Sequence, residues 1–181
     1  IDWHAQVYVD GEFVGEHKGG YAPFHFDITD YLADGAKHTL KIKVLDTTET
    51  SWQPRGKQHL SPNGIWYTAV TGIWQTVWME PVDNAHIETY VAVADIDSQT
   101  LSVQVDANIT DGDVCRIVLL DEGKVVSEAE GPVALLEVPE MKLWSPDTPH
   151  LYDLEISVIR DGKVLDQVKG YTAMRKISHA K

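Results

Sequence analysis

The chain has 181 residues, 43% hydrophobic and 24% charged, a balance typical of a globular protein with room for one large or two small domains. Its formal net charge of −13, without a basic stretch, makes nucleic acid and anionic membrane surfaces unsuitable partners. The single cysteine, Cys115, excludes an intrachain disulfide and a thiolate metal cluster, and no apolar run approaches the roughly 20 residues that span a bilayer.

The first part of the chain is predicted to be almost entirely β-structure, because apolar and polar residues alternate with a period of two. Asp10-Gly11 is a typical two-residue turn between paired strands. Thr29-Asp30 predicts one short helical turn, through DYLADG. In chain order, the expected strands are residues 3–9, 12–18, 21–28 and 37–46.

A long loop follows at residues 46–63, DTTETSWQPRGKQHLSPN. After it, GIWYTAV and GIWQTVWMEPV are predicted to form two strands that meet at Thr71-Gly72. Loops longer than about 12–15 residues are uncommon in compact domains and are often functional. This loop has the composition of a sugar contact, because an indole offers a flat apolar face and polar side chains offer hydrogen bonds to hydroxyl groups. The candidate binding residues are Asp46, Glu49, Trp52 and Arg55, with Gln58 beside them.

The second part of the chain predicts seven short strands in about a hundred residues, the pattern of an immunoglobulin-like sandwich. The strand before the last turn begins in LYDLEISV, and the last strand is predicted to run through KVLDQVKGYTAMRKI. We place the domain boundary at Pro81–Asn84, which divides the chain into domains 1–82 and 83–181. The turn signals are Asp97-Ser98, Asp111-Gly112, Glu122-Gly123 and Asp161-Gly162.

Several motifs in this order resemble glycoside hydrolase family 2, the β-galactosidase, β-glucuronidase and β-mannosidase group. WHAQVYVDGEFVGEHKGGYAPFHFDITDYL is similar to the hairpin and following segment of the family's sugar-binding jelly-roll domain, and GIWQTVWMEPV to the strand that ends it. KLWSPDTPHLYDLEISV and GYTAMRKI resemble strands of the family's next, immunoglobulin-like domain. The resemblance implies an all-β chain with a jelly-roll-like sandwich followed by an immunoglobulin-like sandwich.

The same resemblance implies that the chain is an internal piece of a glycosidase. It opens on IDWHAQVYVDG, in the middle of a strand pattern, so we expect the jelly-roll to be N-terminally incomplete. The family's catalytic barrel would begin after Lys181, and no catalytic residue is expected among the 28 acidic residues here. The expected function is therefore that of an accessory part, β-galactosidase-like, which supports the barrel and contributes loop 46–63 to the sugar pocket.

Other chemistries are less well supported by the residues. Ser61 is near His59 in the sequence, but it precedes a proline and lacks the strained strand-to-helix turn of a hydrolase nucleophile. His4, His17 and His25 are spaced as residues of neighbouring strands, where solvent-facing histidines are common, so neither a metal nor a cofactor is expected.

Two questions, each with three possible answers, remain open at the level of sequence. Loop 46–63 contacts sugar, packs on the barrel, or is disordered in this chain. The chain as a whole is an accessory part, an autonomous carbohydrate-binding module using Trp52 and Trp144, or a structural sandwich whose loop is ordered by its own contacts. Because strands would be missing from the first sandwich, we also expect self-association, or a surface that another chain covers.

Overall fold

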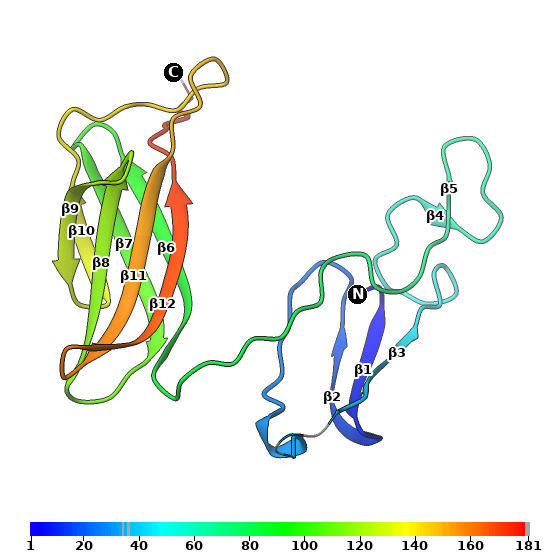
Figure 1. Ribbon diagram of the computed structural model, residues 1–181. Coiled ribbons are helices and arrows are strands. Elements are labelled where there is room, and N and C mark those ends of the chain that lie inside the picture. Colours follow the sequence, from blue (N-terminus) through cyan, green and yellow to red (C-terminus); the bar gives the residue numbers. More distant parts are fainter. Residues whose placement is uncertain (34, 36, 180–181) are drawn as a thin grey trace. The chain divides into compact units, whose positions relative to one another are not determined.

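The chain divides into two units, Ile1–Met79 and a second unit that begins at Glu80 (Figure 1). The computed structural model describes residues 1–33, 35 and 37–179. Within these residues the regular elements are strands, apart from a 3₁₀ helix at Thr29–Tyr31, and no helix has the length and apolar character needed to cross a membrane. The predicted all-β class is confirmed. The predicted turn DYLADG overlaps the 3₁₀ helix, but its residue 34 lies outside the described residues, and the predicted boundary after Val82 stays a prediction.

The regular part of the first unit is a three-stranded antiparallel sheet. Its strands are β1 (His4–Val9), β2 (Glu12–Lys18) and β3 (Leu40–Leu45), in the order β2-β1-β3. The predicted hairpin is confirmed: Asp10 and Gly11 have φ angles of 50° and 94°, the left-handed values that a tight two-residue turn requires. The alternation in β1 buries one face of the sheet through Ala5, Val7 and Val9.

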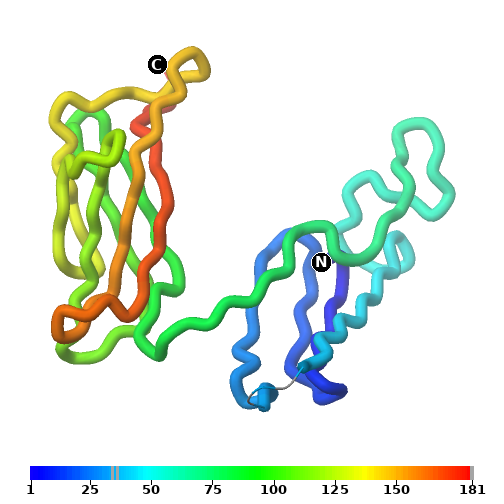
Figure 2. The backbone as a smooth tube through the Cα atoms, in the orientation of Figure 1, coloured from blue at the N-terminus to red at the C-terminus, as the bar shows by residue number. Residues whose placement is uncertain are grey.

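Residues 21–28 cover this buried face without joining the sheet. The ring of Phe24 stacks on His17 of β2 with centroids 4.4 Å apart, and Phe26 lies against Gly15, where a β-carbon would come within 2.5 Å of the ring. Figure 2 shows the segment returning along the sheet. The prediction of a strand here is wrong. The alternating aromatic side chains pack onto the sheet, but the backbone of residues 21–28 forms no ladder of hydrogen bonds with a strand.

The prediction of two strands at residues 64–82 is also wrong for most of their length. Only β5 (Tyr67–Thr68) is paired, in parallel with β4 (Gln58–His59). Gly72 and Asp2 then exchange two backbone hydrogen bonds of 2.9 Å. Residues 73–79 form no strand (Figure 1), because a strand needs a neighbouring backbone and no described strand supplies one.

The second unit is an immunoglobulin-like sandwich, as predicted. A three-stranded sheet, β10-β7-β6, faces a four-stranded sheet, β12-β11-β8-β9 (Figure 1). The last strand ends at residue 172 rather than 177, because its ladder with the preceding strand ends there. The strands are β6 (His86–Asp95), β7 (Thr100–Asn108), β8 (Asp113–Asp121), β9 (Lys124–Glu130), β10 (Val133–Glu137), β11 (Tyr152–Arg160) and β12 (Lys163–Thr172).

The core of this sandwich is made by alternate residues of the two inner faces. Leu101 and Val103 of β7 meet Ile117 of β8 and Leu154 of β11, all of them fully buried. Cys115 belongs to the same core at 2% exposure, and its burial raises the pKa of the thiol above the usual value. The cysteine is therefore a buried strand residue of β8.

Candidate functional site

The base of loop 46–63 is organised by the carboxylate of Asp46. Its Oδ1 accepts hydrogen bonds from the Thr48 backbone N–H and the Gln53 side-chain amide, and its Oδ2 accepts one from the Thr71 hydroxyl at 2.9 Å. Gln53 and Thr48 are buried within the loop. Asp46 therefore joins the start of the loop to the segment that follows it, and both of its oxygens are already used within the protein.

A second polar cluster lies further along the loop. The Glu49 carboxylate is 3.2 Å from the Arg55 guanidinium and 2.8 Å from Nε2 of His59. Nδ1 of His59 accepts a hydrogen bond from the Ser61 backbone, so the ring proton is on Nε2 and faces Glu49. The Arg55 guanidinium also lies over the ring of Trp66, 5.7 Å from its centroid. Glu49 and Arg55 thus hold each other in place.

Trp52 is the one predicted residue of the four with a free face. Its side chain is 89% exposed, and the contact recorded for its ring is an edge-to-face approach to Trp3 with centroids 6.4 Å apart. Trp144, the other tryptophan that we considered, is half-buried, with the Arg175 guanidinium 4.9 Å from its ring centroid. Of the two indoles, only Trp52 is open for stacking on a ligand.

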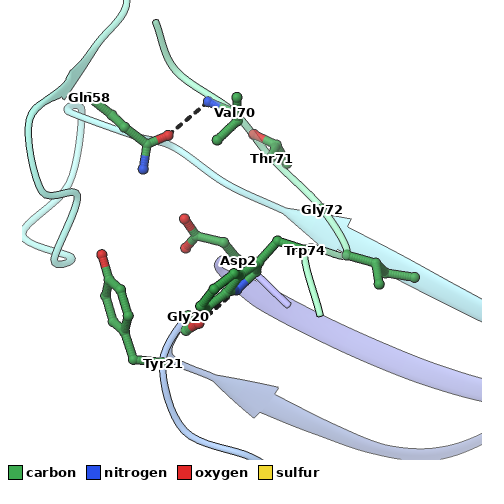
Figure 3. Close-up of a pocket in the computed structure, with 9 residues that line it drawn as sticks. Asp2, Gly20, Tyr21, Gln58, Val70, Thr71, Gly72 and Trp74 are labelled. Carbon is green, nitrogen blue, oxygen red and sulfur yellow. Dashed lines mark hydrogen bonds between the residues drawn. The ribbon is translucent and has the colours of Figure 1, made fainter. Parts of the chain in front are cut away.

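A pocket of about 310 Å³ lies beside the loop, where the start of the chain meets the segment after it (Figure 3). Asp2, Tyr21 and Gln58 direct polar groups toward it, and Trp74 supplies an aromatic wall. The Trp74 indole N–H donates to the Gly20 carbonyl at 2.9 Å, and the Gln58 carbonyl oxygen accepts from the Val70 backbone at 2.7 Å. These bonds fix two of the pocket walls.

The charge in this pocket comes from Asp2. Burial raises the pKa of its carboxyl above the usual value, the negative charge of Asp46 raises it further, and the nearby Gln58 amide lowers it. Oδ1 of Asp2 is buried and has no hydrogen-bond partner among the residues that the structure describes. Sequence reasoning missed this residue because its partner in the fold, Gly72, is seventy positions away and no local pattern connects them.

Two of the histidines considered as metal ligands, His4 and His17, contact different partners. His4 is 2.9 Å from the Glu16 carboxylate, whereas His17 stacks on Phe24. Across residues 1–33, 35 and 37–179, no group of three histidine, cysteine or acidic side chains has the arrangement of a metal site.

Comparison with known proteins gives the family. The model described as "Glycosyl hydrolases family 2, sugar binding domain" matches residues 1–81, and the model described as "Glycosyl hydrolases family 2" matches residues 71–175, more than half of the chain. The chain belongs to glycosyl hydrolase family 2. The resemblance found from the motifs is therefore confirmed, and both parts of the family's accessory region are represented.

Similar family 2 proteins are several times longer than this chain. A β-galactosidase of Thermoanaerobacter pseudethanolicus is 30% identical over 189 aligned residues, which cover 96% of this chain and 24% of that protein. A β-glucuronidase of Sus scrofa is 28% identical, with 86% and 28% covered. The fold is shared with a solved β-glucuronidase from Ruminococcus gnavus, which has a TM-score of 0.80 at 23% identity over 98% of this chain and 32% of that one. The chain spans about a quarter of the length of such relatives.

Proposed function

We propose that this chain is the accessory part of a β-galactosidase-like family 2 glycosidase, in which it supports the catalytic barrel and contributes loop 46–63 to the sugar pocket. The family match and the quarter-length coverage support the accessory role. The observation that carries the loop assignment is Trp52, a large aromatic side chain 89% exposed on a loop whose base is fixed by hydrogen bonds. An exposed indole on an ordered loop is suited to cover a partner surface.

The four loop residues then have different roles in this proposal. Trp52 stacks on the apolar face of a sugar ring, and Glu49 and Arg55 offer hydrogen bonds at the edge of the site. Asp46 is a positioning residue, since its oxygens are engaged by donors of the protein itself. In the full-length protein the barrel carries the two carboxylates of glycoside hydrolysis.

Replacing Trp52 with alanine in the full-length enzyme is expected to lower kcat/KM for a nitrophenyl β-galactoside by about 10-fold or more, the effect of losing one large apolar contact. Steady-state kinetics measure this, with Trp52→Phe as the control that keeps a flat ring. The melting temperature should not change, because the side chain is exposed. An unchanged kcat/KM in Trp52→Ala would rule out the loop contact, and hydrolysis by the 181-residue chain alone would rule out the accessory role.

The second candidate is a carbohydrate-binding module that acts on its own, which the exposure of Trp52 also favours. Calorimetry on the 181-residue chain separates the two. Tight binding of an oligosaccharide that disappears in Trp52→Ala supports the autonomous module. The structural alternative has its own support in the loop's internal hydrogen bonds, and it predicts no effect of Trp52→Ala on either measurement.

Self-association is a further part of the proposal. Residues 58–79 contain no Asp, Glu, Lys or Arg, and within them Trp74, Trp78 and Met79 are 54%, 70% and 73% exposed. We expect the 181-residue chain to sediment as a dimer or larger species at tens of micromolar, and Trp78→Lys to shift it toward monomer. Sedimentation velocity tests this, and a strict monomer at all concentrations would contradict it.

A further inference from the structure

Asn63 and Gly64 form the one Asn-Gly pair of the sequence, in the connection between β4 and β5 (Figure 1). The Trp66 backbone N–H donates to the Asn63 carbonyl at 3.0 Å and closes a tight turn, in which Gly64 has a φ of 58°. Glycine adopts that positive value without strain. Residues 60–68 are all exposed, so water reaches the turn. A side-chain amide, an unhindered backbone nitrogen and water therefore meet at one place.

We propose that Asn63 is a site of spontaneous covalent modification, at which its side-chain amide is converted to a carboxylate. The Gly64 nitrogen attacks Cγ of Asn63, and the new N–C bond closes a succinimide ring as the amide nitrogen leaves as ammonia, taking up the Gly64 amide proton. Water then opens the ring at either carbonyl, which leaves aspartate or isoaspartate at position 63. Nothing is oxidised or reduced, and water is the only other reactant. The inference does not require that the chain contact a sugar.

The hydrogen bonds of the turn leave both reacting nitrogens available. The Gly64 N–H has no hydrogen-bond partner within residues 1–33, 35 and 37–179. Nδ2 of Asn63, the leaving nitrogen, donates to the Ser61 carbonyl at 3.4 Å, which is longer than an ordinary N–H···O bond. A β-carbon placed on Gly64 would meet no described atom within 4 Å beyond those of its chain neighbours, so nothing packs over the attacking nitrogen.

The chain contains two other asparagines, and the structure restrains both. The nitrogen that would attack Asn84 belongs to Ala85, which is 3% exposed and donates its N–H to the Asp83 carboxylate at 3.1 Å. Asn108 is the last residue of β7, and its Nδ2 donates to the Asn84 carbonyl at 2.8 Å. It is also followed by a β-branched residue, which crowds the backbone nitrogen. Reaction is therefore expected at Asn63 well before the other two.

The product changes the character of the segment in which it forms. Residues 58–79 contain no Asp, Glu, Lys or Arg, so the reaction gives this apolar stretch its first acidic side chain. Moving a charge from water into an apolar interface costs free energy. The modification should therefore oppose the self-association proposed above, and this consequence alone rests on that proposal. Because ammonia is lost, the change proceeds in one direction.

Mass spectrometry of the 181-residue chain during incubation in buffer tests the modification. Chymotrypsin releases residues 61–66, SPNGIW, in which Asn63 is the only asparagine. This peptide should gain about 1 Da as NH₂ is replaced by OH. The gain should be about 10-fold faster or more than at Asn84 and Asn108, because glycine leaves its nitrogen unhindered. The rate should rise with pH, since the deprotonated nitrogen is the nucleophile.

Two controls identify the mechanism. Electron-transfer fragmentation should detect isoaspartate at position 63, because the succinimide opens at either carbonyl, whereas direct hydrolysis of the side chain gives aspartate alone. Gly64→Ala should slow the reaction by about 10-fold or more, because its methyl group hinders the attacking nitrogen. Equal rates at the three asparagines, or aspartate without isoaspartate, would overturn the inference.

Sedimentation velocity tests the consequence for assembly. Asn63→Asp should weaken self-association by about 10-fold relative to Asn63→Gln, which keeps a neutral amide at the same position. Equal association of these two variants would overturn the link between modification and assembly. If the unmodified chain is a monomer at every concentration, the self-association proposal fails, and the mass measurement still decides the modification.

Discussion

Replacing Leu136 with alanine is expected to destabilise the second unit by about 2–5 kcal/mol, the usual effect of opening a cavity in a close-packed core. Leu136 is 1% exposed in β10, where it pairs with Leu101 and faces the other sheet. Urea unfolding followed by far-UV circular dichroism gives the change, and hydrogen exchange in β7 and β11 assigns it to this unit.

The chain offers a matched control at the next position. Leu135 lies in the same strand but points outward with 68% exposure, so Leu135→Ala should change the free energy of unfolding by no more than about 0.5 kcal/mol. Equal effects of the two substitutions would mean that β10 does not bury one face as described.

Replacing Asp46 with alanine is expected to open loop 46–63. Three hydrogen bonds to its carboxylate are lost, and at about 1 kcal/mol each the open population should rise about 100-fold. Limited trypsin digestion measures this as faster cleavage after Arg55 and Lys57, since a protease acts on the opened form.

Two further variants make the result specific. Asp46→Asn keeps an acceptor at Oδ1 and should be cleaved at a rate between those of the original chain and the alanine variant. Asp27→Ala removes a carboxylate that, among the described residues, bonds to Thr29 and not to the loop, and should not affect cleavage in the loop. If loop 46–63 of Asp46→Ala resists trypsin as well as the loop of the original chain does, the carboxylate does not hold the loop closed.

The sandwich of the second unit could be predicted because its determinants are local. Each strand carries its own alternation, and turns such as Glu122-Gly123 and Asp161-Gly162 have the positive φ angles that their sequences predict. The predicted strand at residues 73–79 failed for the opposite reason. Alternation describes which side chains share a face, but a strand also needs a neighbouring backbone, and that depends on residues elsewhere.

The candidate site shows the same division between local and distant information. Trp52 and the length of the loop are visible in the sequence, and both point to loop 46–63 as the candidate site. The contacts of Asp46 with Thr71 and of Asp2 with Gly72 join residues 25 and 70 positions apart. Nothing in the spacing of these residues predicts that the Asp46 carboxylate is engaged, whereas Oδ1 of Asp2 has no partner within the described part of the chain.

The burial of Cys115 makes it an internal reporter of opening. It is the only thiol in the chain, 2% exposed in β8, and its raised pKa keeps it in the unreactive protonated form. A maleimide reagent can therefore reach it only when the sandwich opens, so the labelling rate follows the free energy of that opening. A second cysteine introduced at an exposed position can carry one fluorophore without competition from the native thiol.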